Sequence, residues 1–206
     1  ELAGVGVALK LLQALLQGVG KEGQLDELID LVALGTVADM MPLLGENRYL
    51  VKEGLELINT NPRLGIREMI AQTRLDIGSV DAGGISWVIA PRLNAAGRLA
   101  HALTSYKLLM TDSPQEARQL TTWLEEKNTE RQRLTTGALA RARRQVLAQG
   151  ISPLLVVCDK DCLAGIAGLV AGRLSEEFYR PAIVIKTGEQ VSGGSCRSIP
   201  EFNIIA

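Results

Sequence analysis

The chain has 206 residues, of which 47% are hydrophobic and 22% are charged, and its formal net charge at pH 7 is -1. The hydrophobic content predicts a folded chain that forms one domain or two smaller ones. The near-neutral charge excludes a free-standing domain that binds nucleic acid through bulk positive charge, so any anion site has to be local. Because only 3% of the residues are aromatic, the core must rest on aliphatic side chains, and few rings are available to stack on bases.

The three cysteines have no framework spacing, which favours a reducing cytoplasm over an oxidised secreted scaffold. The sequence contains neither a signal peptide nor an apolar stretch long enough to span a membrane, so we expect a cytoplasmic protein without a membrane partner. The chain begins without methionine inside an apolar pattern, and it ends on apolar residues. We therefore expect an internal piece of a longer protein.

Helical periodicity dominates the first half of the chain. It predicts helices over residues 2–17, 25–34, 46–58, 66–72 and 81–89. The last of these is expected to stop before Pro91, because the residue before a proline avoids the helical region. Asp39 is expected at a chain turn after the second helix, and residues 91–99 (PRLNAAGRL) at a turn of small residues.

A longer helix is expected from Ser113 to Gly150. Ser113, Pro114 and Glu116 have the spacing of a capping box, which predicts a helix start. No strong helix breaker follows until Gly150 except Gly137, so the pattern predicts one long connector between two lobes, with charged residues on its solvated faces. Two helices that break at Gly137 are the alternative.

The pattern changes after Gly150 to strand, helix and strand. Residues 153–158 and 182–185 are predicted strands, residues 165–178 a helix, and residues 191–199 the start of a third strand. This is the βαβ unit of an α/β domain. One helix cannot cover both faces of a parallel pair, so we expect more chain beyond Ala206. The predicted fold class is α/β, with a mostly helical first part joined by the long helix to a partial α/β domain.

Two segments in the first half have residue types suited to phosphate chemistry. In residues 91–99, the small residues would let the backbone approach an anion while Arg98 supplies a planar fork of donors, although a tight turn with a solvated arginine is the alternative. Asp39 lies in an apolar stretch, where a carboxylate has to pair, accept hydrogen bonds or bind a cation, since its burial alone costs several kcal/mol. A helix cap or a buried acceptor would also explain it.

A third candidate lies near the C-terminal end. Ser195 and Arg197 follow Gly193 and Gly194, and a hydroxyl, a guanidinium and free backbone N–H groups would form an anion nest. A glycine bend in an edge strand is the alternative. Arg173 is expected either to reach a phosphate or to form a surface salt bridge.

The other conspicuous residues have structural explanations. The glycine spacing within 165–172 predicts close packing of a helix rather than a binding site. The remaining residues are expected to be buried cysteines, packing tryptophans and a histidine at a helix start, namely Cys158, Cys162, Trp87, Trp123 and His101.

Four segments together resemble one family. They are GTVADMMPL within 34–43, PRLNAAGRL at 91–99, GLVAGRL at 168–174 and SGGSCRS at 192–198, in this order. The chain resembles, over essentially all of its length, the RecJ family of single-stranded-DNA-specific exonucleases in the DHH phosphoesterase superfamily. The resemblance implies the C-terminal part of a DHH catalytic domain over 1–112, a connector helix over 113–150 and the N-terminal part of a DHHA1-like nucleic-acid-binding domain over 151–206.

The resemblance also implies functional residues. Asp39 would be a catalytic ligand of a pair of divalent ions, Mn²⁺ or Mg²⁺, and Arg98 would be catalytic and bind phosphate. Residues expected to bind nucleic acid or phosphate are Asn94, Gly97, Arg98, Arg173, Gly194, Ser195 and Arg197. The family's Asp-His-His motif is absent from this sequence, and one carboxylate cannot hold two ions, so we expect the chain by itself to be inactive.

The implied function is 5′-to-3′ hydrolysis of single-stranded DNA in recombination and repair, with two-metal catalysis in the full-length protein. Single-stranded DNA is the expected partner, and a single-strand-binding protein or a helicase are further partners that the resemblance suggests. One alternative is a relative that degrades oligonucleotides or cyclic dinucleotides. Another is a non-catalytic, nucleic-acid-binding scaffold.

Overall fold

The computed structural model describes residues 1–205, apart from the side chains of Glu22 and Gln24. The chain divides into two compact units. The first comprises Glu1–Ala96 and His101–Glu125, and the second comprises Gly97–Ala100 and Glu126–Ala206. The boundary between them therefore falls within the long helix, which contributes to both.

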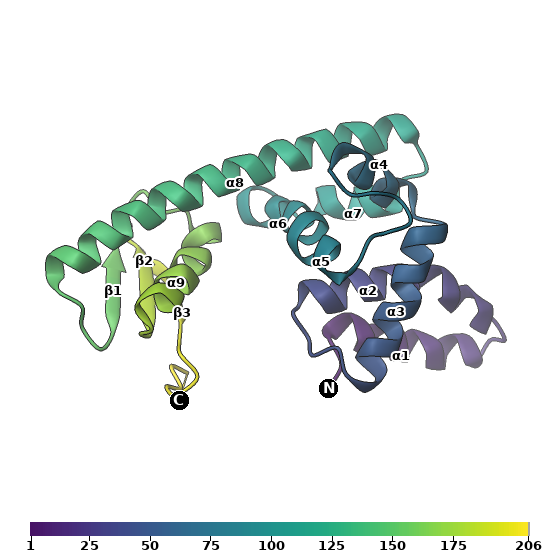
Figure 1. Cartoon of the computed structure of the whole chain (residues 1–206), viewed down its shortest axis with the longest axis horizontal. Helices are drawn as coiled ribbons and strands as arrows, with labels where there is room; N and C mark the ends of the chain where they lie inside the picture. Colours follow the sequence, from purple (N-terminus) through teal and green to yellow (C-terminus); the bar gives the residue numbers. More distant parts are fainter. Residues whose placement is uncertain (206) are drawn as a thin grey trace. The chain divides into compact units, whose positions relative to one another are not determined.

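All the secondary-structure elements described in the first unit are helices (Figure 1). Its elements are α1 (Gly4–Gln17), the 3₁₀ helix η1 (Glu22–Leu28), α2 (Ile29–Ala38), α3 (Gly45–Thr60), α4 (Leu64–Gln72), α5 (Ala82–Gly84), the π-helical turn η2 (Ile85–Ile89), α6 (Ala90–Leu99), α7 (Leu103–Met110) and the first part of α8 (Pro114–Gln149). The predicted helix over 25–34 is thus shifted, because residues 22–28 form the tighter 3₁₀ turn and the α-helix begins at Ile29.

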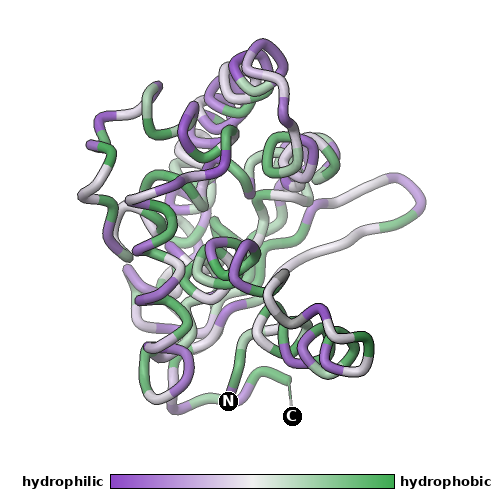
Figure 2. The backbone as a smooth tube through the Cα atoms, turned by 90° about the vertical axis from the view of Figure 1, so that its right-hand side faces the viewer, coloured by the Kyte–Doolittle hydropathy of each residue, from purple (hydrophilic) through white to green (hydrophobic). Residues whose placement is uncertain are grey.

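The core of the first unit consists of large aliphatic side chains. Ile58, Ile66, Met69, Ile85 and Ile89 are completely buried there. Helices α2 and α3 pack closely at Gly54, where an added Cβ would lie 2.5 Å from the carbonyl oxygen of Ile29. Figure 2 shows hydrophilic and hydrophobic residues alternating along the helices, as one-sided burial requires.

The predicted helix end before Pro91 is wrong, and so is the predicted turn over residues 91–99. The helix continues through Pro91 as α6. The turn just before it is π-helical, with the N–H of Ala90 bonded to the carbonyl of Ile85. A π-turn widens the backbone where proline lacks an N–H and its ring crowds the preceding turn, so the helix absorbs the proline instead of ending. Trp87 on this turn is 80% exposed, so it is not the packing residue that the sequence predicted.

Helix α8 is continuous from Pro114 to Gln149, so the alternative of a break at Gly137 is wrong. The Oγ of Ser113 accepts the backbone N–H of Glu116 at 3.3 Å, as the capping motif predicts. The second half of the capping box differs, because the Glu116 carboxylate accepts a hydrogen bond from the hydroxyl of Thr111. Trp123, also on this helix, packs against the first core as predicted.

The second unit contains a three-stranded sheet in the order β1 (Leu155–Cys158), β2 (Ala182–Lys186), β3 (Gly193–Arg197). Strands β1 and β2 are parallel, with Leu155 opposite Ala182, and α9 (Ala164–Phe178) connects them. This confirms the predicted βαβ unit. Strand β3 is antiparallel to β2, with Ser195 opposite Val184.

The core of the second unit is made of smaller side chains than that of the first. Ala138, Ala142 and Val146 of α8 belong to the same cluster as Leu155 and Val157 of β1. The cluster also contains Cys162 just before α9, two residues of β2 and five residues of α9, namely Ala182, Val184, Ile166, Ala167, Val170, Ala171 and Leu174. Across residues 1–205, the helices are too short or too polar to traverse a lipid bilayer.

Candidate phosphate-binding site

Asp39 lies at the end of α2, where its backbone N–H donates to the carbonyl of Gly35 at 3.0 Å. The helix closes through Met40, which has φ 54°, and the N–H of Met41 returns to the carbonyl of Thr36 at 3.3 Å. This is a Schellman-type end with a methionine in the left-handed position that glycine usually occupies. The turn predicted at Asp39 is confirmed.

The expected burial of Asp39 is wrong. Its side chain is exposed, so the carboxylate does not have to be neutralised by a partner within the chain. Asp39 lines an open pocket of about 430 Å³, together with the exposed Asn94 of α6 and residues of α1 and α2. The structure thus brings two of the predicted site residues together within the first unit.

The buried carboxylate of the first unit is Asp30, which the sequence analysis did not single out. It is 1% exposed, and its Oδ2 accepts the Nε of Arg63 at 2.6 Å while its Oδ1 accepts the N–H of Leu31 at 2.8 Å. Because Asp30 and Arg63 are far apart in the sequence, no local pattern indicates that they form an ion pair. Asp30 is therefore explained as a structural residue.

The described residues do not form a metal site by themselves. Among the side chains that the structure describes, no three or more histidines, cysteines, aspartates or glutamates cluster in a way that could hold an ion. Asp39 is a hard oxygen ligand suited to Mn²⁺ or Mg²⁺, but a single exposed carboxylate is insufficient to hold two ions. The chain by itself therefore does not fit a two-metal centre.

The second unit gathers arginine side chains around the start of α9. An added Cβ at Gly165 would lie 2.0 Å from the carbonyl oxygen of Arg98, so this glycine is required for the backbone of residues 97–100 to rest on the helix. The Nη1 of Arg98 donates to the carbonyl of Gly165 at 3.2 Å. The contact fixes one end of the guanidinium and leaves its other donors available.

One turn further along α9, Gly168 faces the second predicted pair. An added Cβ there would lie 3.0 Å from the Oγ of Ser195 and 3.1 Å from the Nη2 of Arg197. The Nη1 of Arg197 in turn donates to the Oγ of Ser195 at 3.4 Å and to the carbonyl of Cys196 at 2.7 Å. The predicted close packing of α9 is therefore confirmed at Gly165 and Gly168, but not at Gly172, where an added Cβ would meet only the Cγ of Arg197 at 3.9 Å.

The predicted nest of free backbone N–H groups is wrong in its geometry. Gly193 and Gly194 are extended in β3 and paired with β2, rather than curved around an anion. An added Cβ at Gly194 would lie 2.6 Å from the carbonyl oxygen of Val184, so the close approach of the two strands explains this glycine. The donors of the candidate site are therefore side chains.

Three further predicted residues contribute less. Gly97 is exposed within α6, next to Arg98. Arg173 of α9 pairs with Glu176 at 3.8 Å on an exposed face, which favours the salt-bridge explanation. His101 is exposed and its Nδ1 accepts the N–H of Leu103 at 3.1 Å, which confirms its place at a helix start.

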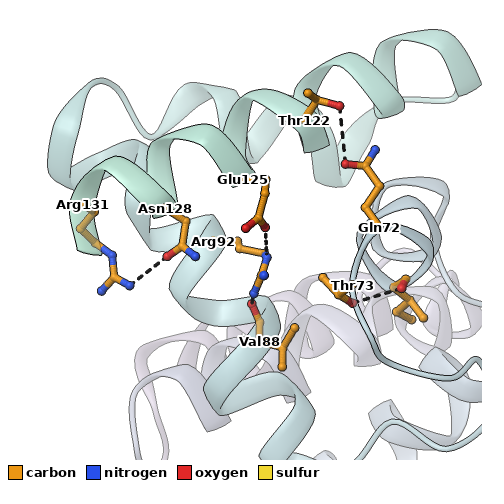
Figure 3. A network of polar contacts seen from close by, with 9 residues as sticks. Gln72, Thr73, Val88, Arg92, Thr122, Glu125, Asn128 and Arg131 are labelled. Carbon is orange, nitrogen blue, oxygen red and sulfur yellow. Dashed lines mark hydrogen bonds and ion pairs between the residues drawn. The ribbon is translucent and has the colours of Figure 1, made fainter. Parts of the chain in front are cut away.

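The pairing of the arginines separates structural from available guanidinium groups. Arg92 of the first unit pairs with Glu125 and donates to the carbonyl of Val88 at 2.7 Å (Figure 3). By contrast, Arg98 and Arg197 form no ion pair with any carboxylate of the described residues. Unpaired guanidinium groups held in fixed positions are the usual ligands of phosphate.

One arginine of the second unit was missed by the sequence analysis. Arg131 of α8 is half-buried, and its Nη2 donates to the Oδ1 of Asn128 at 2.9 Å (Figure 3). Its pKa is lowered, first by burial and then by the positive charge of Arg98. A run of charged residues on a long helix gives no local signal that separates this residue from its exposed neighbours.

Comparison with known proteins agrees with the resemblance seen in the sequence. The chain is 41% identical to RecJ of Bacillus subtilis, 36% to that of Thermus thermophilus and 35% to that of Escherichia coli, each described as a single-stranded-DNA-specific exonuclease. These alignments cover 99%, 98% and 97% of the chain but 26%, 29% and 37% of the relatives. No family model matches the chain.

Solved structures give the same result. The crystal structures of Thermus thermophilus RecJ in complex with Mn²⁺ and with Mg²⁺ superpose with TM-scores of 0.82 and 0.85, at 36% and 35% identity. The matches cover 95% and 98% of this chain and 29% and 31% of those chains. The chain thus spans about a quarter to two fifths of the curated relatives named above. In sequence and in fold, the chain is similar to a part of the RecJ exonucleases.

Proposed function

We propose that this chain is the strand-holding part of a single-stranded-DNA exonuclease. The full-length protein would hydrolyse phosphodiester bonds from the 5′ end, in recombination and repair. The RecJ relatives support the reaction class, and the two metal-bound RecJ structures support Mn²⁺ or Mg²⁺ as the cofactor. The bound ions would supply Lewis-acid activation of the phosphodiester.

Within this proposal, Ser195 and Arg197 bind a phosphate of the strand, and Arg98 binds a phosphate at the beginning of α9. The observation that carries the proposal is the convergence of the Oγ of Ser195 and the Nη2 of Arg197 beside Gly168, without a carboxylate partner among the described residues. A phosphate oxygen accepts well from both groups, because a hydroxyl and a guanidinium are both donors. Since the contacts are to phosphate, binding would depend little on base sequence.

Asp39 and Asn94 have separate parts in the proposal. Asp39 would be one ligand of the metal pair, with the remaining ligands supplied from outside this chain, and Asn94 would bind a phosphate beside it in the same pocket. The exposure of Asp39 supports this role, because an exposed carboxylate that lines the pocket is accessible to an ion. The two glycines, Gly97 and Gly194, would act only by leaving room for the backbone near the strand. Arg173 would act only through its ion pair with Glu176 near the strand.

Binding of a 5′-phosphorylated oligothymidylate to the purified chain tests the proposal. Arg197→Ala is expected to weaken binding about tenfold or more, because it removes a charge-assisted contact. Arg143→Ala is the matched control, since Arg143 is an exposed arginine of the same unit that pairs with Glu177 at 2.7 Å. Equal affinities of the two variants, or no binding of the unmodified chain at low salt, would contradict the proposal.

A nuclease assay tests the assignment of the metal ligands. The purified chain, incubated with MnCl₂ and a labelled single strand, is expected to release no nucleotides, because its described residues contain no complete metal site. Manganese-dependent release that disappears with EDTA would show that the chain holds a complete centre, and the proposed division of the ligands would then be wrong.

A further inference from the structure

Arg131 combines three features that are unfavourable for a merely structural residue. Its side chain is half-buried, its Nε is buried without a hydrogen-bond partner, and none of the described carboxylates pairs with it. A buried donor without an acceptor and a charge without a counter-charge both lower the stability of the folded state. The structure therefore leaves the charge of Arg131 without a counter-charge among the described residues.

The position of Arg131 is nevertheless fixed. Asn128 lies one turn before it on α8, is only 2% exposed, and accepts the Nη2 of Arg131 at 2.9 Å (Figure 3). Because the buried Asn128 amide accepts a hydrogen bond from the guanidinium, it restrains the orientation of the Arg131 side chain. The Nη1 of Arg131 has no hydrogen bond within the described structure and remains as a donor.

Arg98 is a second positive charge near Arg131, which makes the binding of an anion more favourable. Leu99, next to Arg98, and Leu134, one turn after Arg131, pack against the same core cluster of the second unit. The charge of Arg98 is close enough to lower the pKa of Arg131. Arg98 is itself held by the carbonyl of Gly165, so neither guanidinium is free to turn away without losing a hydrogen bond.

We propose that Arg131 and Arg98 together bind one backbone phosphate of single-stranded DNA, with Asn128 as the positioning residue for Arg131. The inference rests on the proposed function, and it adds to it a second phosphate contact supplied by α8. A phosphate would give Arg131 the counter-charge that the protein does not provide, and it would relieve the repulsion between the two cations.

The test is a pair of measurements on the Arg131→Met variant, which removes the charge and keeps most of the volume. Affinity for the oligothymidylate is expected to fall about tenfold, and the slope of log affinity against log salt to decrease by about 0.7, the value for one lost phosphate contact on a single strand. The urea midpoint is expected to stay the same or to rise, because an unpaired buried charge is removed. A purely structural arginine would give the reverse, a lower midpoint with an unchanged slope.

Two controls complete the experiment. Arg133→Met removes the same charge from an exposed position on the same helix and is expected to change the affinity less than twofold. Asn128→Ala is expected to weaken binding by a smaller factor than Arg131→Met while leaving the salt slope unchanged, because the charge stays but its orientation is lost.

The outcomes separate this inference from the proposed function. If Arg197→Ala weakens binding and Arg131→Met leaves both affinity and slope unchanged, the second phosphate contact is refuted while the proposed function stands. If Arg197→Ala has no effect and Arg131→Met has none either, both are refuted. A loss of affinity and slope for Arg131→Met, larger than for Arg133→Met, supports the inference.

Discussion

The two units differ in whether the arginines discussed above have carboxylate partners. In the first, Asp30 pairs with Arg63 and Arg92 with Glu125. In the second, Arg98, Arg131 and Arg197 have fixed hydrogen bonds but no carboxylate partners among the described residues. Arg141 and Arg143 of the second unit do pair with carboxylates, those of Asp159 and Glu177. Since an uncompensated charge costs stability, the comparison indicates that the paired arginines of both units hold the fold, while the three unpaired arginines of the second unit are available to bind a ligand.

The ion pair of the first unit provides the largest expected effect. Arg63→Met would leave Asp30 charged and 1% exposed without its partner, so the free energy of unfolding is expected to fall by about 3–5 kcal/mol. Urea unfolding followed by tryptophan fluorescence measures it, because both tryptophans, Trp87 and Trp123, lie in the first unit. The second unit is expected to behave differently, since Arg131→Met should leave the free energy of unfolding unchanged or raise it.

The double variant Asp30→Asn with Arg63→Met is the control. It removes both charges, so it is expected to recover much of the stability that Arg63→Met loses. If the single variant costs less than about 1 kcal/mol, the pair behaves like an exposed salt bridge and the contrast between the units disappears.

The glycine contact under Arg98 gives the next largest effect. Gly165→Ala would place a Cβ 2.0 Å from a backbone oxygen, which no side-chain rotation relieves, so we expect a loss of about 1–3 kcal/mol and weaker DNA binding. Far-UV circular dichroism in urea and the oligothymidylate assay measure the two effects.

Gly172→Ala is the matched control on the same helix. Its added Cβ would approach nothing nearer than the Cγ of Arg197 at 3.9 Å, and alanine favours the helix over glycine by about 1 kcal/mol. We therefore expect equal or higher stability with unchanged binding. A similar loss for both variants would show that the contact with Arg98 is not what Gly165 provides.

Thiol labelling examines the second unit alone, because all three cysteines lie in it. Cys162 is buried, and its pKa is raised first by burial and then by the charge of Asp159. A raised pKa means less thiolate at any given pH, so Cys162 is expected to react with iodoacetamide only when the unit opens. Cys158 is exposed, so its burial expected from the sequence is wrong, and it is expected to react at once.

Mass spectrometry of Cys158→Ser and Cys196→Ser variants assigns the labelling rates. Raising the pH from 7 to 9 should increase the rate at Cys158 far more than at Cys162, since burial still blocks access to the second thiol. Reaction of Cys162 in the native protein as fast as Cys158 would show that the small-residue core of the second unit is open in solution.

The sequence was sufficient for features that depend on local chemistry. The cap at Ser113 and Pro114 predicts the start of α8, and short apolar runs predict β1 and β2, because both signals act within a few residues. The turn at Asp39 was also correct, although its exposure was not, since an apolar stretch on both sides does not determine which way a helix-end side chain points.

Features that depend on tertiary contacts were missed. A π-helical turn lets α6 continue through Pro91, and its cost is offset by the packing of Ile85 and Ile89 in the core. The orphan Nε of Arg131 depends on burial by a distant segment, so a charged helix sequence cannot reveal it. The RecJ resemblance supplied Arg98 and Arg197 as candidates, but only the structure shows that glycines of α9 hold both.

The smallest expected effect lies on α8 and separates helix propensity from site geometry. Gly137→Ala adds a Cβ at an exposed position whose nearest neighbour is the Nη1 of Arg141 at 3.7 Å, so we expect a gain of about 0.5–1 kcal/mol in urea and no change in DNA affinity. Gly150→Ala is the opposing control, because Gly150 has φ 82° and alanine is strained there. A gain in DNA affinity for Gly137→Ala would mean that a stiffer α8 improves the placement of Arg131. A lower free energy of unfolding would instead mean that Gly137 relieves a constraint on the helix. Because the two glycines differ in backbone angle and not in burial, opposite signs for the two variants would attribute the effect to conformation alone.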